Sequence, residues 1–175
     1  MLNQARPAIV SMLLFTLLLG GAYPALVTAA GGALFPAQAE GSLVRDEAGT
    51  IIGSSLIGQI TTSPQHLWPR PSAAGDGYNA AGSSGSNLGP LNPALTERVA
   101  ADAEAVRAYA PEGAIPPDAV TTSGSGLDPE ISPDFAALQI GRIAAARGIA
   151  PEAVAAVIAA NTAQPFAWVY RAAAC

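Results

Sequence analysis

Apolar residues are distributed unevenly along this chain. No charged residue occurs between Arg6 and Glu40, and residues 8–27 are almost entirely apolar. About 20 apolar residues are enough to cross the hydrocarbon core of a bilayer as a helix. Tyr23 and Pro24 lie where an interfacial aromatic residue and the end of such a helix are expected. The pattern predicts a transmembrane helix over residues 8–28, after a short N-terminus at 1–7 and before a connector at 29–42.

A cleavable signal peptide is the alternative interpretation of the same stretch. Arg6 supplies a positive N-terminal region, and Ala37-Gln38-Ala39 resembles a cleavage site. The distance from Leu19 to Ala39 is long for a signal peptide, which favours a retained helix. In both interpretations the positive-inside rule leaves Arg6 in the cytoplasm and exports the domain at 43–175.

Beyond the connector, short periodic segments alternate with long polar loops. Residues 43–60 predict two strands joined by a turn at Ala48-Gly49, and residues 115–121 predict another strand. Helical spacing and capping residues predict helices at about 92–109, 132–147 and 150–161. The fold class is therefore α+β, with one N-terminal transmembrane helix and a small exported mixed α/β domain that carries long ordered loops.

The same periodicity predicts which side chains are buried. The expected core positions in the strands and helices are Val44, Ile51, Ile52, Leu56, Ile57, Leu95, Val99, Ala103, Val106, Phe135, Leu138 and Ile143. Charged residues of the helices, among them Arg98, Asp102 and Arg142, are expected on the solvent-facing sides.

Two long loops are nearly uncharged and rich in Gly, Ser and Pro. Residues 83–93 read SSGSNLGPLNP, and residues 121–133 read TTSGSGLDPEISP. Leucine and isoleucine side chains interrupt the polar residues, so we expect loops with a fixed backbone shape that present a docking surface. The residues expected to shape these loops or to dock partners are Arg70, Asn87, Asn92, Ser125 and Asp128.

These five residues also have simpler interpretations. Asp128, Asn87 and Asn92 are typical of turns and helix caps, where the side chain bonds nearby backbone groups. Arg70 lies between two prolines that restrict its backbone, so both a partner contact and a staple between loops remain open.

Composition narrows the possible chemistry. Apolar residues make up 50% of the chain and charged residues 12%, with a mean hydropathy of +0.33, which favours a membrane protein. The net charge of -5 and the lack of a basic cluster argue against nucleic-acid binding. Because Cys175 and His66 are the only residues of their kinds, an internal disulfide and a cysteine- or histidine-rich metal site are excluded.

The sequence matches known catalytic motifs only weakly. The loop at 121–126 has no lysine, so it does not match a phosphate-binding P-loop. His66, Asp128 and a serine at 123 or 125 formally supply a hydrolytic triad, but Gly124-Ser125-Gly126 lacks the spacing of a nucleophile elbow. A structural or docking role is favoured over hydrolysis or nucleotide binding by these loops.

Short motifs occur in a specific order between about Arg6 and Gly148. They are Arg6-Pro7-Ala8, Tyr23-Pro24, Leu34-Phe35-Pro36-Ala37-Gln38-Ala39, Gly41-Ser42-Leu43, residues 53–59, Trp68-Pro69-Arg70-Pro71-Ser72-Ala73, Tyr78-Asn79, residues 86–90, Asn92-Pro93, residues 121–133, Gln139, Arg142 and residues 144–148. In this order they resemble the C subunit of the bacterial Kdp potassium-transporting ATPase.

The resemblance implies a non-catalytic, single-pass subunit of an inner-membrane pump that couples ATP hydrolysis to high-affinity potassium uptake. It implies two main partners, a channel-like potassium-translocating subunit and a P-type ATP-hydrolysing subunit. It also implies a role in assembly and as a catalytic chaperone that raises the ATP affinity of the hydrolysing subunit, which makes ATP the implied cofactor. With an exported domain, that effect on ATP affinity would be allosteric.

Two other classes remain open at this point. An independent exported binding protein or hydrolase, released by cleavage after Ala39, predicts a soluble chain that starts at Glu40. Direct binding of cytoplasmic nucleotide predicts the opposite topology.

The C-terminus departs from the pattern of the family that the chain resembles. Its members end in a strand, whereas residues 161–175 read NTAQPFAWVYRAAAC. We expect the final strand of this domain to be altered or truncated, which would leave a bare sheet edge.

Overall fold

A computed structural model describes residues 2–163, so the expected change at the C-terminus lies mostly outside the described residues. The chain divides into two compact units, Met1–Leu56 and Ile57–Cys175, and each is described by itself.

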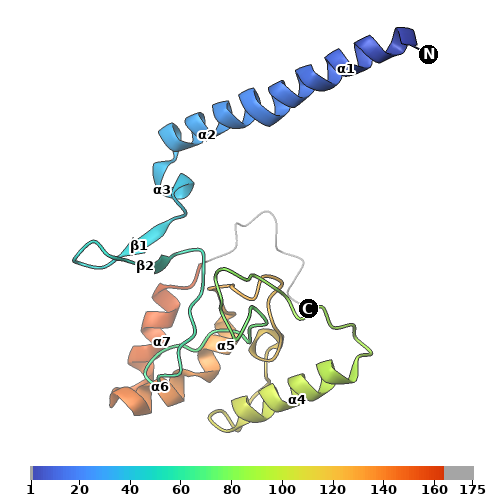
Figure 1. Cartoon of the computed structure of the whole chain (residues 1–175). Coiled ribbons are helices and arrows are strands. Elements are labelled where there is room, and N and C mark those ends of the chain that lie inside the picture. The colour runs from blue at the N-terminus through green and yellow to red at the C-terminus, as the bar shows by residue number, and fades with distance from the viewer. Residues whose placement is uncertain (1, 164–175) are drawn as a thin grey trace. The chain divides into compact units, whose positions relative to one another are not determined.

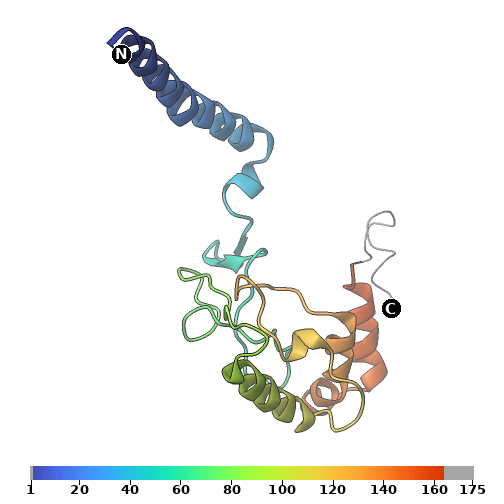
Figure 2. The same ribbon diagram turned by 90° about the vertical axis from the view of Figure 1, so that its right-hand side faces the viewer.

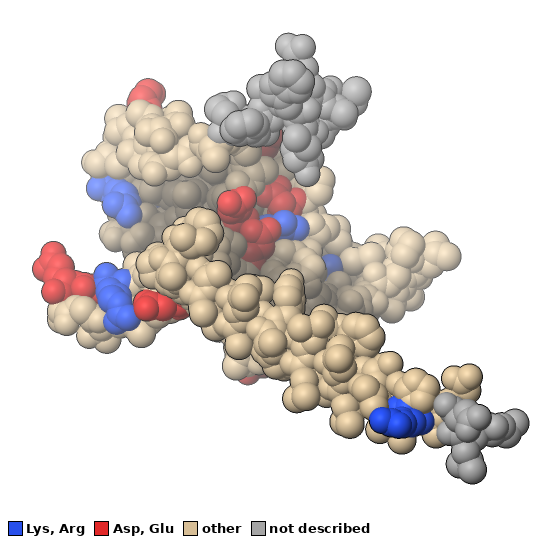
Figure 3. Space-filling view, turned by 90° about the horizontal axis from the view of Figure 1, so that it is seen from above, with Lys and Arg blue, Asp and Glu red and all other residues tan. Residues whose placement is uncertain are grey.

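The first unit begins with a long apolar helix. The helices α1 (Leu2–Leu17), η1 (Leu18–Ala22) and α2 (Tyr23–Leu34) follow one another without a break (Figure 1), and Figure 2 shows the same continuous rod. The stretch Gln4–Leu34 has 31 residues and is apolar enough to cross a membrane. Its length is about 46 Å at 1.5 Å per residue. Figure 3 shows it as a tan surface without charged side chains beyond its N-terminal end.

The apolar character of this helix indicates a membrane location. A signal sequence near an N-terminus can meet the same criteria of length and composition, so the helix is compatible with both of the interpretations above.

The helix continues past Pro24, where its end was expected. Proline has no N–H and its ring crowds the carbonyl of the residue four positions earlier. Here that crowding coincides with η1, a wider π-helical turn in which the Tyr23 N–H donates to the Leu18 carbonyl. The residues expected to form a connector after 28 are helical up to Leu34, and α3 (Pro36–Ala39) follows.

A two-stranded antiparallel hairpin completes the first unit. Strands β1 (Leu43–Arg45) and β2 (Ile51–Ser54) are joined by the predicted turn, in which Asp46 Oδ1 accepts from the backbone N–H groups of Ala48 and Thr50. The expectation of buried side chains is wrong here: Val44, Ile51, Ile52 and Leu56 are 41–64% exposed. Strands of three and four residues have too little surface to enclose their own apolar side chains.

The second unit is helical and rich in loops. Its helices are α4 (Pro93–Arg107), the short 3₁₀ turn η2 (Pro117–Ala119), α5 (Pro133–Leu138), α6 (Ile140–Arg147) and α7 (Pro151–Ala160). Figures 1 and 2 show α4 on one side, the packed pair α6 and α7 on the other, and α5 with the long loops between them.

Residues 115–121 do not form the predicted strand. Pro116 and Pro117 lack the N–H groups that a strand ladder needs, and the segment instead forms η2. Residues 57–163 contain no strand, so the α+β class is confirmed only in the coarser sense of helices accompanied by the β1–β2 hairpin.

Local capping signals set the helix ends as predicted. Asn92 Oδ1 accepts from the Ala94 N–H at 3.0 Å at the start of α4, and Ser132 Oγ accepts from the Phe135 N–H at 3.0 Å at the start of α5. Gly148, with a φ of 65°, ends α6 in the left-handed conformation. The helix predicted over 132–147 is interrupted at Gln139, which separates α5 from α6.

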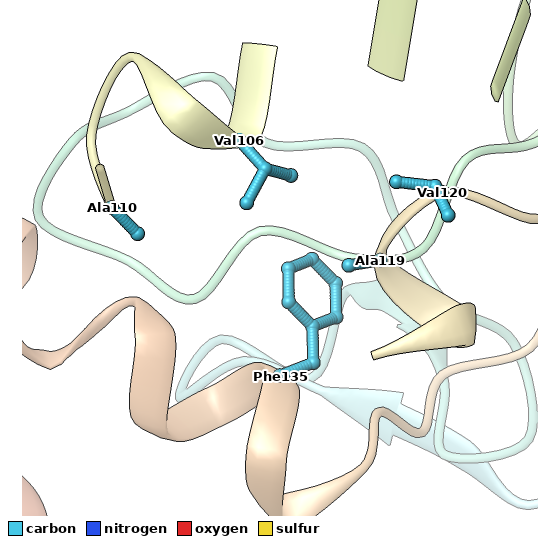
Figure 4. Close-up of a cluster of buried hydrophobic side chains, with 5 residues drawn as sticks. All are labelled: Val106, Ala110, Ala119, Val120 and Phe135. Atoms are coloured by element: carbon cyan, nitrogen blue, oxygen red, sulfur yellow. The ribbon is translucent and has the colours of Figure 1, made fainter. Parts of the chain in front are cut away.

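The apolar core of the second unit is small. In Figure 4 the ring of Phe135 points from α5 toward Val106 of α4 and Ala119 of η2, and Ala110 and Val120 complete this cluster. A second cluster between α6 and α7 contains Ile143, Ala144 and Val154. Because most of these side chains are small, we infer that hydrogen bonds between loops contribute much of the order in this unit.

Gly126 is the position where added volume should be least tolerated. Its φ is 66°, and a Cβ atom there would lie 2.5 Å from the Ser84 carbonyl oxygen and 2.8 Å from Ala74 Cβ. We expect Gly126→Ala to lower the free energy of unfolding by about 2–4 kcal/mol, because left-handed backbone strain adds to overpacking. Urea unfolding of the detergent-solubilised full chain measures this.

Gly141→Ala is the matched control for Gly126→Ala. Gly141 lies in α6 with nothing within 4 Å of an added Cβ. Alanine there is expected to stabilise the helix by up to about 1 kcal/mol. A Gly126→Ala chain as stable as the wild type would show that the loops do not approach each other this closely.

Candidate functional site

The segments 68–78 and 123–130 cross in the second unit, and we call this crossing the loop junction. Arg70 Nη1 lies 2.9 Å from Asp128 Oδ2, and the two side chains are 22% and 30% exposed. Asp128 Oδ1 also accepts from the Glu130 N–H at 3.0 Å, so one carboxylate holds both the arginine and its own turn. The partial burial makes this pair stronger than a fully exposed one.

Tyr78 closes the loop junction from the other side. Its hydroxyl is directed at the carbonyl oxygens of Arg70, at 3.0 Å, and Asp128, at 3.3 Å. Its φ of 54° is unusual for an aromatic residue. Its ring packs so closely on Gly58 that a Cβ atom there would lie 2.6 Å from Cε1. Burial, and to a lesser extent the charge of Asp128, raises the pKa of Tyr78, so its phenol stays a hydrogen-bond donor at neutral pH.

Ser72 connects the two segments through its hydroxyl group. Its Oγ donates to the Gly126 carbonyl at 2.6 Å and accepts from the N–H groups of Ala74 and Tyr78. The loop at 83–93 is attached to the same junction, because the Ser125 carbonyl accepts from the Ser84 N–H and the Ser83 hydroxyl, both at 2.9 Å. The two Gly/Ser loops are therefore joined by hydrogen bonds, a pairing that their composition did not predict.

A second set of contacts fixes the start of the first segment. Gln139 is fully buried, and its side chain exchanges two hydrogen bonds with the backbone of Trp68: Oε1 accepts from N–H at 2.7 Å and Nε2 donates to the carbonyl at 3.1 Å. The Arg142 guanidinium lies 3.7 Å from the centre of the Trp68 ring and donates to Gln139 Oε1. Tyr109 meets the same ring edge-on, with 5.3 Å between centroids.

Arg142 was expected on a solvent-facing side, and that expectation is wrong. It is half-buried and also donates to the carbonyl oxygens of Pro64 and His66. Burial lowers the pKa of Arg142, and interaction with Tyr109 opposes that shift. The guanidinium still carries its charge at neutral pH and anchors residues 64–68 on α6.

An open cleft of about 500 Å³ lies beside the loop junction. Its walls include the aromatic side chains of Trp68, Tyr78, Tyr109 and Phe135. Among its polar residues are Arg70 and two carboxylates, Asp76 on a loop and Asp102 on α4. Clefts of this size, with apolar walls and few polar groups, are typical of binding sites.

Asp102 differs from the prediction that placed it on the solvent side of α4. It is half-buried, and its Oδ2 atom is buried without a hydrogen-bond partner among residues 2–163. Arg98, one turn earlier, is also half-buried, and its Nε atom is likewise buried without a hydrogen-bond partner among residues 2–163. Burial raises the pKa of the Asp102 carboxyl, and the charge of Arg98 opposes this shift.

The five predicted site residues are not all brought together. Arg70 and Asp128 form the ion pair, and Ser125 joins the same junction through its carbonyl and by accepting from the Leu127 N–H. Asn87 and Asn92 act locally: Asn87 has a φ of 51° and donates to the Gly85 carbonyl, and Asn92 caps α4. The turn and capping interpretations of Asp128 and Asn92 are confirmed, and docking by these residues stays a prediction.

Sequence reasoning did not select Ser72, Tyr78, Gln139 or Asp102 as site residues. The first three belong to the motif segments Trp68–Ala73, Tyr78-Asn79 and Gln139, so the order of motifs carried a usable signal. Asp102 carried no such signal, because helical periodicity alone assigns a charged residue to solvent.

The residues that the structure describes form a shaped surface more than a reactive centre. They contain no group of three or more His, Cys, Asp or Glu side chains placed to hold a metal ion. The exposed His66 side chain makes no hydrogen bond to a serine or an aspartate within residues 2–163.

Comparison with known proteins identifies relatives over nearly the whole chain. The family model described as KdpC, K+-transporting ATPase, c chain, matches residues 5–173. A potassium-transporting ATPase KdpC subunit of Caulobacter vibrioides is 57% identical over 165 residues, which cover 94% of this chain and 84% of that protein. The KdpC subunit of Geobacter sulfurreducens is 49% identical over 162 residues, 92% of this chain and 86% of that protein.

Gln139→Leu tests the attachment of Trp68. Leucine would leave the partly buried backbone N–H and carbonyl of Trp68 unpaired, so we expect the free energy of unfolding to fall by about 2–4 kcal/mol. Gln65→Leu is the control, because Gln65 is exposed and should change stability by less than about 0.5 kcal/mol. Equal urea midpoints for the two variants of the full chain would contradict the prediction.

The raised pKa of Asp102 predicts that the stability of the folded chain depends on pH. Because its pKa is raised in the folded chain, the folded state binds this proton more tightly than the unfolded state does. This carboxyl therefore lowers stability as the pH rises from the ordinary pKa of an aspartate through the raised value. We expect Asp102→Asn to raise the midpoint of thermal unfolding at neutral pH and to lose that advantage below about pH 4. Glu97→Gln, on the exposed side of α4, should show no such crossover.

Proposed function

The chain belongs to the KdpC family of potassium-transporting ATPase c chains, and from that premise we propose that it is a non-catalytic subunit of an ATP-driven, high-affinity potassium pump. The observation that carries this proposal is the loop junction. Its polar side chains form an ion pair and hydrogen bonds that hold the loops in one shape. A surface of fixed shape suits the docking of partner subunits.

We propose that the partners are the channel-like potassium-translocating subunit and the P-type ATP-hydrolysing subunit. In this arrangement Gln4–Leu34 spans the inner membrane once, and the domain at 43–175 lies outside the cytoplasm. The orientation rests on Arg6, the basic residue that precedes the apolar stretch.

The proposed role combines assembly with a catalytic-chaperone effect. The chain would raise the ATP affinity of the hydrolysing subunit without contacting cytoplasmic ATP. Such an effect is allosteric: docking of the exported domain must favour the pump conformation that binds ATP more tightly.

The alternative is an independent exported binding protein or hydrolase, released by cleavage after Ala39. The apolar N-terminal helix is compatible with this, because a signal sequence can meet the same criteria of length and composition. Direct binding of cytoplasmic nucleotide is a further alternative, and it requires the opposite topology.

The first test uses a tagged full chain expressed with the other Kdp subunits. We expect the chain to co-purify from membranes and its domain to be digested by protease added only to the outer face of spheroplasts. A pump assembled without the chain should need about fivefold more ATP or higher for half-maximal hydrolysis, the lower limit of typical allosteric coupling.

Variants then test the loop junction. Asp128→Asn should weaken co-purification, because it removes the charge that holds Arg70 across the two loops. Glu130→Gln is the control, since Glu130 is a neighbouring exposed carboxylate. A soluble chain that begins at Glu40 and associates with no subunit would instead support the exported alternative.

A further inference from the structure

The cleft beside the loop junction contains a carboxylate that folding alone does not explain. The Asp102 Oδ2 atom is buried and has no hydrogen-bond partner within residues 2–163. A buried, unpaired charged oxygen destabilises a folded chain. Groups of this kind occur where a binding partner supplies the missing interaction.

The nearest charge of opposite sign does not supply that interaction. Arg98 acts on the Asp102 carboxyl through its charge, but no atoms of the two groups approach within the 4.0 Å of an ion pair. Arg98 does not line the cleft, whereas Asp102 does. Asp102 therefore contributes to the wall of the cleft without an ion-pair partner of its own.

The charges around the cleft favour a cationic occupant. Arg70 lines it, but its charge is already matched by Asp128 at 2.9 Å. Asp76 is exposed at the cleft and forms no ion pair or hydrogen bond among the described residues. Asp76 and Asp102 thus form no ion pair among the described residues.

The aromatic walls favour the same occupant. Cations bind the faces of tryptophan and tyrosine rings, and guanidinium groups also stack on them. The chain itself gives an example, because the Arg142 guanidinium already lies over Trp68, 3.7 Å from the ring centre. Tyr78 and Tyr109 provide further ring surface in the cleft.

We infer that this cleft receives a cationic side chain, an arginine or a lysine, presented by a partner subunit of the pump. The carboxylates of Asp102 and Asp76 pair with its charge, and Trp68, Tyr78 and Tyr109 enclose its stem. This inference rests on the proposed function, because it gives the chemistry of one docking contact in the proposed complex.

The test measures the affinity of the purified, detergent-solubilised full chain for a complex of the other Kdp subunits. Asp102→Asn keeps the shape of the side chain and removes its charge. We expect its Kd to rise about tenfold or more, because the partner's cation loses a desolvated counter-charge. In the free chain, the same substitution should keep or raise the midpoint of thermal unfolding, since an unpaired buried charge is removed.

Two further variants make the result decisive. Glu97→Gln also removes one negative charge, but from the exposed side of α4. It should leave the Kd within about twofold of the wild-type value, as for surface charges outside an interface. Asp76 lies on an exposed loop, so Asp76→Asn should leave the folded structure intact and weaken binding several-fold. This variant decides the matter if Asp102→Asn proves unstable.

The failures are distinguishable. If Asp102→Asn and Asp76→Asn bind as tightly as the wild type, the cleft does not take a cation and the inference is overturned, while the proposed function stands. If the wild-type chain itself does not bind the other subunits, the proposed function fails first.

Discussion

The ion pair between Arg70 and Asp128 is the constraint on which the second unit depends. Loops that cross without a sheet have no ladder of backbone hydrogen bonds to fix their register. The pair supplies a fixed point, and the hydroxyl groups of Tyr78 and Ser72 bond to carbonyl oxygens on either side of it. Because the apolar clusters consist mostly of small side chains, such as those around Phe135, these polar contacts determine where the loops lie. The unit is thus organised from its loops as much as from its helices.

The features that sequence reasoning predicted well are those encoded by neighbouring residues. Asn92, Ser132 and Gly148 set helix ends through contacts within a few residues, so the helices and most of their bounds followed from the sequence. The hairpin turn was predicted for the same reason. Burial of the hairpin and a strand at 115–121 were predicted wrongly, because both depend on long-range partners. The break at Gln139 was also missed; the side chain there bonds to Trp68, 71 residues earlier, a contact that helical spacing does not encode.

The site shows the same limit. Arg70 and Asp128 were recognisable, because an arginine between prolines and an isolated aspartate before a proline are unusual in otherwise uncharged loops. Nothing local indicated that they pair, and nothing indicated that Tyr78 and Ser72 bridge the same segments. Asn87 and Asn92 were chosen from equally suggestive loops, yet their contacts are local. Composition identifies loops with a fixed shape, and only the fold shows which residues fix it.

Three charged residues assigned to solvent by helical periodicity are half-buried, and they differ in an informative way. Arg142 is engaged by Trp68, Gln139 and backbone carbonyls through its terminal nitrogens, and only its Nε is buried without a partner among the described residues. Arg98 and Asp102 each retain such an atom as well, and their side chains make no hydrogen bond or ion pair among the described residues. A charged residue buried against the helical pattern is therefore either a structural anchor, where most of its polar atoms are paired, or part of a surface that awaits a partner, where its side chain makes no hydrogen bond. Among the residues that the structure describes, these unpaired side chains are the ones whose burial the chain does not explain by itself.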